Sequence, residues 1–223
     1  MDWEALRVSL KLSGFTLLML LPPAIIAGRW LAYRRFYGKS LVQALLAVPL
    51  VLPPTVLGYY LLVALGGASP LGRELQSLIG RPLVFNFEGL LIASVLVNIP
   101  FAVQPIQRAF EAIPREIREA AACCGMPPCR VLQRIELPLA WPGIVSAVAM
   151  TFAHTLGEFG VVLMVGGNIP GATRTIAVAV YDRVQAFDNS SAATMSAFLL
   201  VLSMMCIALT YLISDRNHKV YGP

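Results

Sequence analysis

Two ionisable residues, His154 and Glu158, stand four positions apart inside an otherwise uncharged apolar stretch. At this spacing their side chains lie on one face of a helix and can pair. A charged group in an apolar environment is costly unless it is paired. Gly157 and Gly160 flank the acid and favour a break in the helix. We therefore favour a structural role for the pair at this break over direct contact with a ligand.

No segment gathers the residues that catalysis or metal binding needs. The chain has only two histidines, and no nucleophile, base and orienting acid converge in any segment. Its four cysteines form no Cys-x-x-Cys pair, so neither a metal site nor a disulfide is expected. Gly38-Lys39-Ser40 matches the end of a phosphate-binding loop, but the first glycine of that motif would fall at Tyr33. The sequence therefore predicts neither an enzyme nor an ATP-binding subunit.

A polar, basic segment, residues 111–138, lies between two long apolar runs. Pro114 suits the first turn of a helix, and two glutamates follow near its positive end. Gly125 suits the left-handed position that ends a helix, and Pro127-Pro128 would start a second one. The segment therefore reads as a helix, a turn and another helix.

The first of these helices has one apolar face made mostly of small side chains: Ile117, Ala120, Ala121 and Cys124. Small side chains allow a helix to lie deep in a groove of another protein. Packing against its own chain is the alternative. A structured polar loop between apolar runs is compatible with docking of a soluble partner, but on these residues alone packing against its own chain is the favoured reading.

Composition identifies the environment of the chain. Hydrophobic residues make up 57% and charged residues 13%, with a mean hydropathy of +0.72, more apolar surface than a soluble fold can bury. The net charge of +5 is not arranged as a basic patch interleaved with aromatics, so nucleic acid is not expected as a partner. The sequence predicts an all-α integral membrane protein whose surroundings are the lipid bilayer.

Five apolar stretches are long enough to supply the about 20 residues that cross a bilayer. They are 12–28, which needs about one more turn at an end, 41–72, 89–107, 139–165 and 189–214. We expect five spanning helices in a single transmembrane domain over residues 1–223. Several prolines fall inside these stretches, and the carbonyls they leave without partners suggest kinked helices around a wet path.

Basic residues give the orientation. Segments 29–39, 108–134 and 216–219 hold eleven Lys and Arg residues, whereas the N-terminus, 73–81 and 174–183 hold six. The positive-inside rule then places the N-terminus in the periplasm and the 111–138 loop and the C-terminus in the cytoplasm.

The loop matches a known pattern. Its seven defining positions resemble the coupling loop of type I ABC importer permeases: Glu119, Ala120, Ala121, Gly125, Ile135, Leu137 and Pro138. The resemblance implies that the loop docks on a cytoplasmic ABC ATPase, which carries the ATP and Mg, while this chain binds no cofactor. It also implies a homodimer, a periplasmic oxyanion-binding protein as partner, and a multi-pass location in the inner membrane.

Two further segments resemble permeases for tetrahedral oxyanions. Residues 49–62 are similar to a helix that lines the central pathway in molybdate-type permeases. Residues 152–176 contain Gly-Glu-Phe-Gly and an Asn-Ile-Pro-Gly-x-Thr-Arg-Thr-Ile run closest to the molybdate branch. The resemblance suggests these residues as pathway or gate-supporting: Pro53, Pro54, Thr55, Gly58, Gly157, Glu158, Gly160, Asn168, Thr173, Arg174 and Thr175.

One residue departs from the family pattern. Such permeases commonly carry Arg where this chain has His154, which leaves Glu158 with a conditional rather than a permanent cation.

The resemblance implies that the substrate imported is molybdate, with tungstate as a nearly equal candidate. A sulfate or thiosulfate permease and a stand-alone secondary transporter are the alternatives.

Overall fold

The structure, a computed structural model, describes residues 1–221, apart from the side chains of 209, 211 and 213–221. Every regular element in this part of the chain is helical. In chain order these are α1 Trp3–Tyr33, α2 Lys39–Val51, α3 Pro54–Leu65, α4 Pro70–Ile79, α5 Phe87–Glu111, α6 Arg115–Cys123, α7 Pro128–Val131, the π-helix η1 Leu132–Glu136, α8 Leu137–Gly157, α9 Gly160–Gly166, α10 Ile176–Gln185 and α11 Asn189–Tyr221.

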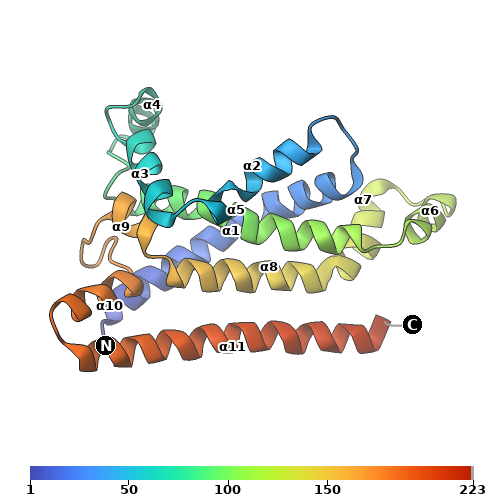
Figure 1. Ribbon diagram of the computed structural model, residues 1–223. Coiled ribbons are helices and arrows are strands. Elements are labelled where there is room, and N and C mark those ends of the chain that lie inside the picture. The colour runs from blue at the N-terminus through green and yellow to red at the C-terminus, as the bar shows by residue number, and fades with distance from the viewer. Residues whose placement is uncertain (222–223) are drawn as a thin grey trace.

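Helices α1, α5 and α8 form the centre of the bundle, and α11 packs along α8. Helices α5, α8 and α11 run roughly side by side and α1 crosses them obliquely, with the N-terminus, α9 and α10 at one end and α6, α7 and the last turns of α11 at the other (Figure 1). The largest cluster of buried apolar side chains lies between the three central helices: Leu20, Ala24 and Leu31 of α1, Ala102, Val103, Ile106 and Phe110 of α5, Ile113, and Ala140, Ile144 and Ala147 of α8.

Two glycines let these central helices approach closely. A Cβ on Gly28 of α1 would lie 2.8 Å from the Cγ2 of Ile106, and one on Gly143 of α8 would lie 2.3 Å from the Cβ of Ala109. Within a membrane, association depends on such close packing, because lipid chains are as apolar as the helices themselves.

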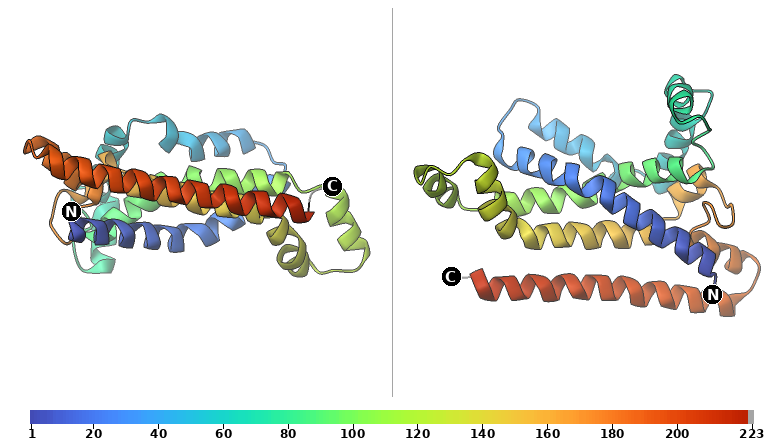
Figure 2. Two further views of the ribbon diagram at one scale, coloured as in Figure 1. Left: turned by 90° about the horizontal axis from the view of Figure 1, so that it is seen from below. Right: turned by 180° about the vertical axis from the view of Figure 1, so that it is seen from behind.

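Among the described residues, four helices are long and apolar enough to span a membrane: Trp3–Tyr33, Phe87–Glu111, Pro128–Gly157 and Asn189–Ala208. The expectation of one helix within 41–72 was wrong. The two halves, α2 and α3, meet at an angle of 108°, and α3 and α4 stand away from the bundle axis (Figure 2). The fifth span is therefore a broken one.

The break follows from Pro53 and Pro54. A residue before proline is driven out of the helical region, and both Leu52 and Pro53 are extended, with ψ of 137° and 135°. Pro49 also lies in this stretch but stays inside α2. The bend thus lies at Pro53 and Pro54, although consecutive prolines alone do not end a helix here, since Pro22 and Pro23 lie inside α1.

The break expected between Gly157 and Gly160 is confirmed, because α8 ends at Gly157 and α9 begins at Gly160. The basic segments 29–39, 108–134 and 216–219 lie at the end of the bundle that carries α6 (Figure 1). Together with the positive-inside rule, this places α6 in the cytoplasm and the N-terminus in the periplasm.

Helices α4 and α10 were not anticipated, because both are short and lie wholly or mostly outside the apolar runs. Asp188 immediately precedes the last span, and its carboxylate accepts hydrogen bonds from the hydroxyl of Ser190 and the amide of Ser191. These hydrogen bonds, chiefly those from Ser191, lower the pKa of Asp188 below its usual value. The negative charge stands at the N-terminal end of α11, where the helix dipole favours it.

Candidate functional site

Helix α6 has nine residues and ends in the turn predicted at Gly125. The φ of Gly125 is +72°. Its amide donates to the carbonyl of Ala122 over 2.9 Å, and the amide of Met126 donates to the carbonyl of Ala121 over 3.2 Å. These two bonds make a complete Schellman motif. Pro127 and Pro128 then start α7, so the helix–turn–helix reading of this loop is confirmed.

The face of α6 that the sequence singled out is divided between the chain and the solvent. Ala121 is 5% exposed and packs on its own chain. Glu119, Ala120 and Cys124 are exposed, and Ile117 is 39% exposed. A partner approaching this end of the bundle would therefore meet the acidic and small side chains of α6.

A buried carboxylate ties α6 to the bundle. Glu136, the last residue of η1, is fully buried. The Nε of Arg29 on α1 donates to its Oε2 over 2.6 Å, and the Nε of Arg118 on α6 donates to its Oε1 over 3.1 Å. The guanidinium of Arg118 also lies 3.5 Å from the ring centroid of Tyr33. We call Arg29, Arg118 and Glu136 the tether, because they join α6 to α1 and to the start of α8.

Sequence reasoning missed the tether. Glu136 lies between Ile135 and Leu137 of the coupling pattern, both of which are half-buried, while Pro138 is exposed at the start of α8. A single acid where the loop turns into an apolar span was the available signal, since such an acid needs a cation partner. Nothing local indicates that one partner lies 107 residues away.

The turn at Gly125 gives a direct test of the loop. Gly125→Val should disfavour the left-handed turn by about 1 kcal/mol or more, misplace α6 and lower uptake while insertion into the membrane is kept. A Cβ at this position would meet nothing within 4 Å, so strain in φ rather than a clash is the cause. Gly125→Asn should retain most uptake, because asparagine tolerates this conformation. Uptake by reconstituted vesicles measures both variants, and normal uptake by the valine variant would contradict a role for the turn.

Helices α3 and α9 meet each other through glycines. Gly58 of α3 and Gly160 of α9 are both buried. A Cβ on Gly58 would lie 2.9 Å from the Cβ of Met164, and one on Gly160 would lie 2.8 Å from the Cβ of Pro54. Pro53, Pro54 and Thr55 are exposed in the single chain. Of the candidate pathway residues, the Pro53–Gly58 group and the Gly157–Gly160 group are thus brought together.

His154 and Glu158 do meet, as predicted. The Nε2 of His154 lies 3.6 Å from the Oε2 of Glu158, and its Nδ1 lies 3.1 Å from the Oδ1 of Asn98 on α5. The imidazole stacks on Phe101 at 4.0 Å between centroids. The other oxygen of Glu158 accepts a hydrogen bond of 2.9 Å from the amide of Val161 at the start of α9. Both carboxylate oxygens of Glu158 therefore contact groups on either side of the helix break, which supports a structural role for this residue.

The loop after α9 holds the remaining candidates. Arg174 lies 3.8 Å from a carboxylate oxygen of Asp2 and 3.8 Å from one of Asp182, and it donates to the Oδ1 of Asn168 over 2.7 Å. Two acids already compensate its charge, which weakens it as an attractor of anions. Thr173 and Thr175 are fully buried, so their side chains line no open path in this structure.

The fold and the site define a class: a multi-span α-helical membrane protein with an exposed, tethered helix at its cytoplasmic end. Residues 24–219 match the family described as "Binding-protein-dependent transport system inner membrane component". The chain belongs to this family, and it is a permease of the inner membrane.

Similar proteins cover nearly the whole chain. A protein of Azotobacter vinelandii named "Molybdenum transport system permease protein ModB" is 43% identical over 98% of this chain and 96% of its own length. The protein of the same name from Escherichia coli (strain K12) is 37% identical over 96% of this chain and 92% of its own length. A "Probable sulfate transport system permease protein cysT" of Marchantia polymorpha is more distant, at 29% identity over 90% of this chain and 72% of its own length.

Solved structures confirm the fold. A crystal structure of a bacterial ABC transporter that imports alginate matches with a TM-score of 0.76 and 18% identity, covering 96% of this chain and 78% of that one. The arrangement of helices described above is therefore that of an ABC importer permease.

Proposed function

We propose that the chain is the membrane-spanning subunit of an ATP-driven importer that moves molybdate into the cytoplasm, with tungstate as a close second substrate. The observation that supports molybdate as the substrate is the similarity, over nearly the full length, to two permeases named for molybdenum transport. The lower identity to the sulfate permease makes sulfate or thiosulfate the alternative.

The exposed side of α6 supports coupling to a cytoplasmic ABC ATPase. Glu119 and Ala120 are exposed there, while the tether fixes the helix to α1 and α8. Movement of the ATPase would reach the spans through this rigid connection. ATP and Mg belong to the partner subunit, and the permease is not itself catalytic. A periplasmic oxyanion-binding protein delivers the substrate at the opposite end.

A second copy of the chain completes the pathway. Helix α2 has no buried residue, and α2 and α3 expose large apolar side chains on this side of the bundle: Leu41, Leu45, Val51, Tyr59 and Tyr60. A broken span with so little of its surface covered suits an interface between two copies, with Pro53, Pro54 and Thr55 near the path. We propose a homodimer.

Reconstitution tests this function. Vesicles holding the permease, its ATPase and its binding protein should take up molybdate only when ATP is supplied on the ATPase side. Unlabelled tungstate should compete strongly and sulfate weakly. Uptake without ATP would instead indicate a stand-alone secondary transporter, and stronger competition by sulfate than by tungstate would reassign the substrate.

The pair at the helix break gives a sharper test within the same assay. Glu158→Gln should lower the uptake rate or the stability without changing the order molybdate, tungstate, sulfate, because glutamine can still accept the hydrogen bond from Val161. His154→Arg is the matched variant and should be tolerated, since it supplies a permanent cation at the same spacing. A changed order of preference in Glu158→Gln would show that this carboxylate selects the anion by repulsion.

A further inference from the structure

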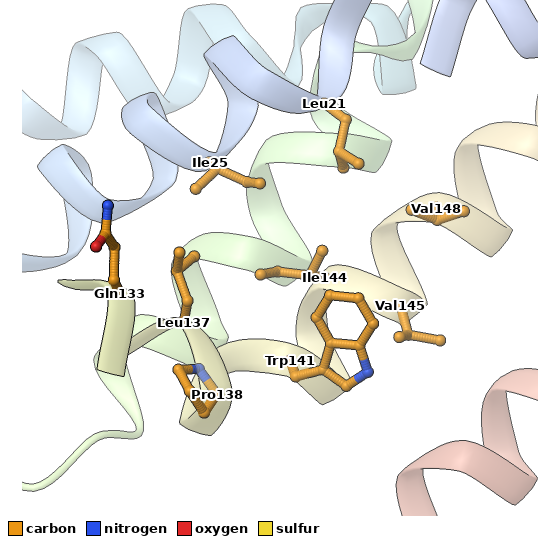
Figure 3. Close-up of a pocket in the computed structure, with 9 residues that line it drawn as sticks. All are labelled: Leu21, Ile25, Gln133, Leu137, Pro138, Trp141, Ile144, Val145 and Val148. Carbon is orange, nitrogen blue, oxygen red and sulfur yellow. The ribbon is translucent and has the colours of Figure 1, made fainter. Parts of the chain in front are cut away.

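An apolar groove opens on the side of the bundle between α1 and α8. It has a volume of about 510 Å³. Figure 3 shows Leu21 and Ile25 of α1 on one side and Trp141, Ile144, Val145 and Val148 of α8 on the other. Gln133 is the one polar side chain in its lining. The lining residues belong to the spans Trp3–Tyr33 and Pro128–Gly157, so the groove lies at the depth of the lipid hydrocarbon chains.

A second cavity continues this groove toward the cytoplasm. It has a volume of about 530 Å³, shares Ile25 with the groove, and is lined by Arg29, Arg34 and Arg118 together with Trp30. We call it the arginine pocket. Glu136 is the carboxylate that Arg29 and Arg118 contact, and Arg34 is exposed and makes no ion pair among the described residues. Three guanidinium groups against one carboxylate leave a surplus of positive charge.

The dimensions of the two cavities match one leaflet of a bilayer. From Leu21 to Arg34, α1 rises about 20 Å at 1.5 Å per residue, while half of the hydrocarbon core is about 15 Å thick. Trp30 and Trp141 are 46% and 51% exposed, and such half-exposed indoles are typical of the membrane–water interface. The surface therefore offers a chain-length apolar groove that ends in a cationic pocket at the level of the headgroups.

We propose that an anionic phospholipid of the inner leaflet binds here, with its phosphate in the arginine pocket and one acyl chain in the apolar groove. The charge surplus selects an anionic headgroup over a zwitterionic one, because basic residues at this depth attract anionic lipid. The groove selects a lipid over free phosphate. Since Arg118 belongs to both the pocket and α6, the bound phosphate stands beside the docking helix. We expect the bound lipid to affect coupling between α6 and the ATPase. This expectation rests on the proposed function, whereas the binding of the lipid does not.

Lipid retention by the purified full-length chain tests the proposal without any transport assay. Native mass spectrometry in mild detergent, with phosphatidylglycerol or phosphatidylethanolamine added, should show preferential retention of phosphatidylglycerol. Arg34→Gln should weaken that retention about five-fold, the effect of one basic residue near an anionic surface. Arg35→Gln is the matched control, because Arg35 is adjacent and exposed but lines a different cavity. Val145→Phe, which narrows the groove without changing charge, should also weaken retention.

Several results would overturn the proposal. Equal losses in Arg34→Gln and Arg35→Gln would mean that diffuse surface charge is sufficient, and equal retention of the two lipids would remove the role of the arginines. Competition by millimolar inorganic phosphate, or no effect of Val145→Phe, would show that the groove holds no acyl chain. Retention confirmed together with unchanged ATP-driven uptake in Arg34→Gln would establish the site and reject its influence on coupling.

Discussion

The Glu136→Met variant should lose most ATP-driven uptake and unfold at a lower temperature than the parent protein. Without the carboxylate, Arg29 and Arg118 face each other with no acceptor between them. Breaking a buried ion pair costs about 3 to 5 kcal/mol. Each arginine side chain is 33% exposed, so water offsets part of the cost of leaving the two charges unpaired. We therefore expect the free energy of unfolding to fall by about 2 kcal/mol. Uptake falls further because α6 loses its link to α1.

Glu116→Gln is the control, because Glu116 is exposed on the first turn of α6 and makes no ion pair among the described residues. It should change stability by about 0.5 kcal/mol or less. Arg118→Met combined with Glu136→Met should cost clearly less than the sum of the two single changes, since both remove the same contact. Strict additivity, or equal effects at Glu116 and Glu136, would argue against the tether.

The Gly160→Ala variant should be destabilised by about 1 to 3 kcal/mol and transport slowly, as overpacked sites generally are. Its new methyl group would lie 2.8 Å from the Cβ of Pro54 and 3.1 Å from the amide nitrogen of Thr55. Because one neighbour is backbone and the other a proline, neither can turn away. Helices α3 and α9 would have to separate, which weakens the contact between them.

Gly157→Ala provides the matched comparison at the other side of the same helix break. A Cβ there meets nothing within 4 Å, and alanine favours the last turn of α8 by up to about 1 kcal/mol over glycine. This variant should therefore match or exceed the parent in stability. Thermal unfolding and initial uptake rates of the two variants decide the matter, and equal damage would mean that the break itself, not the α3–α9 contact, requires glycine.

Several features could be predicted because they depend on neighbours in the chain. Gly125 ends α6 in a left-handed turn since only a residue without a Cβ adopts it freely. The i, i+4 spacing of His154 and Glu158 brought the two side chains into contact. The span expected over 41–72 is present but broken into two helices, because Leu52 and Pro53, each followed by a proline, are extended.

The sequence by itself determined that the chain is a helical membrane protein, how it is oriented, and that residues 111–138 form a structured cytoplasmic loop. Hydropathy, the distribution of basic residues and turn-forming residues depend on composition or on neighbouring residues, so their consequences can be predicted without knowing the tertiary structure. Only the tertiary structure decided that Arg29 and Arg118 share Glu136, that Arg174 lies between Asp2 and Asp182, and that α3 rests on α9. These contacts join segments far apart in the chain, and they exist because packing of the spans brings particular faces together.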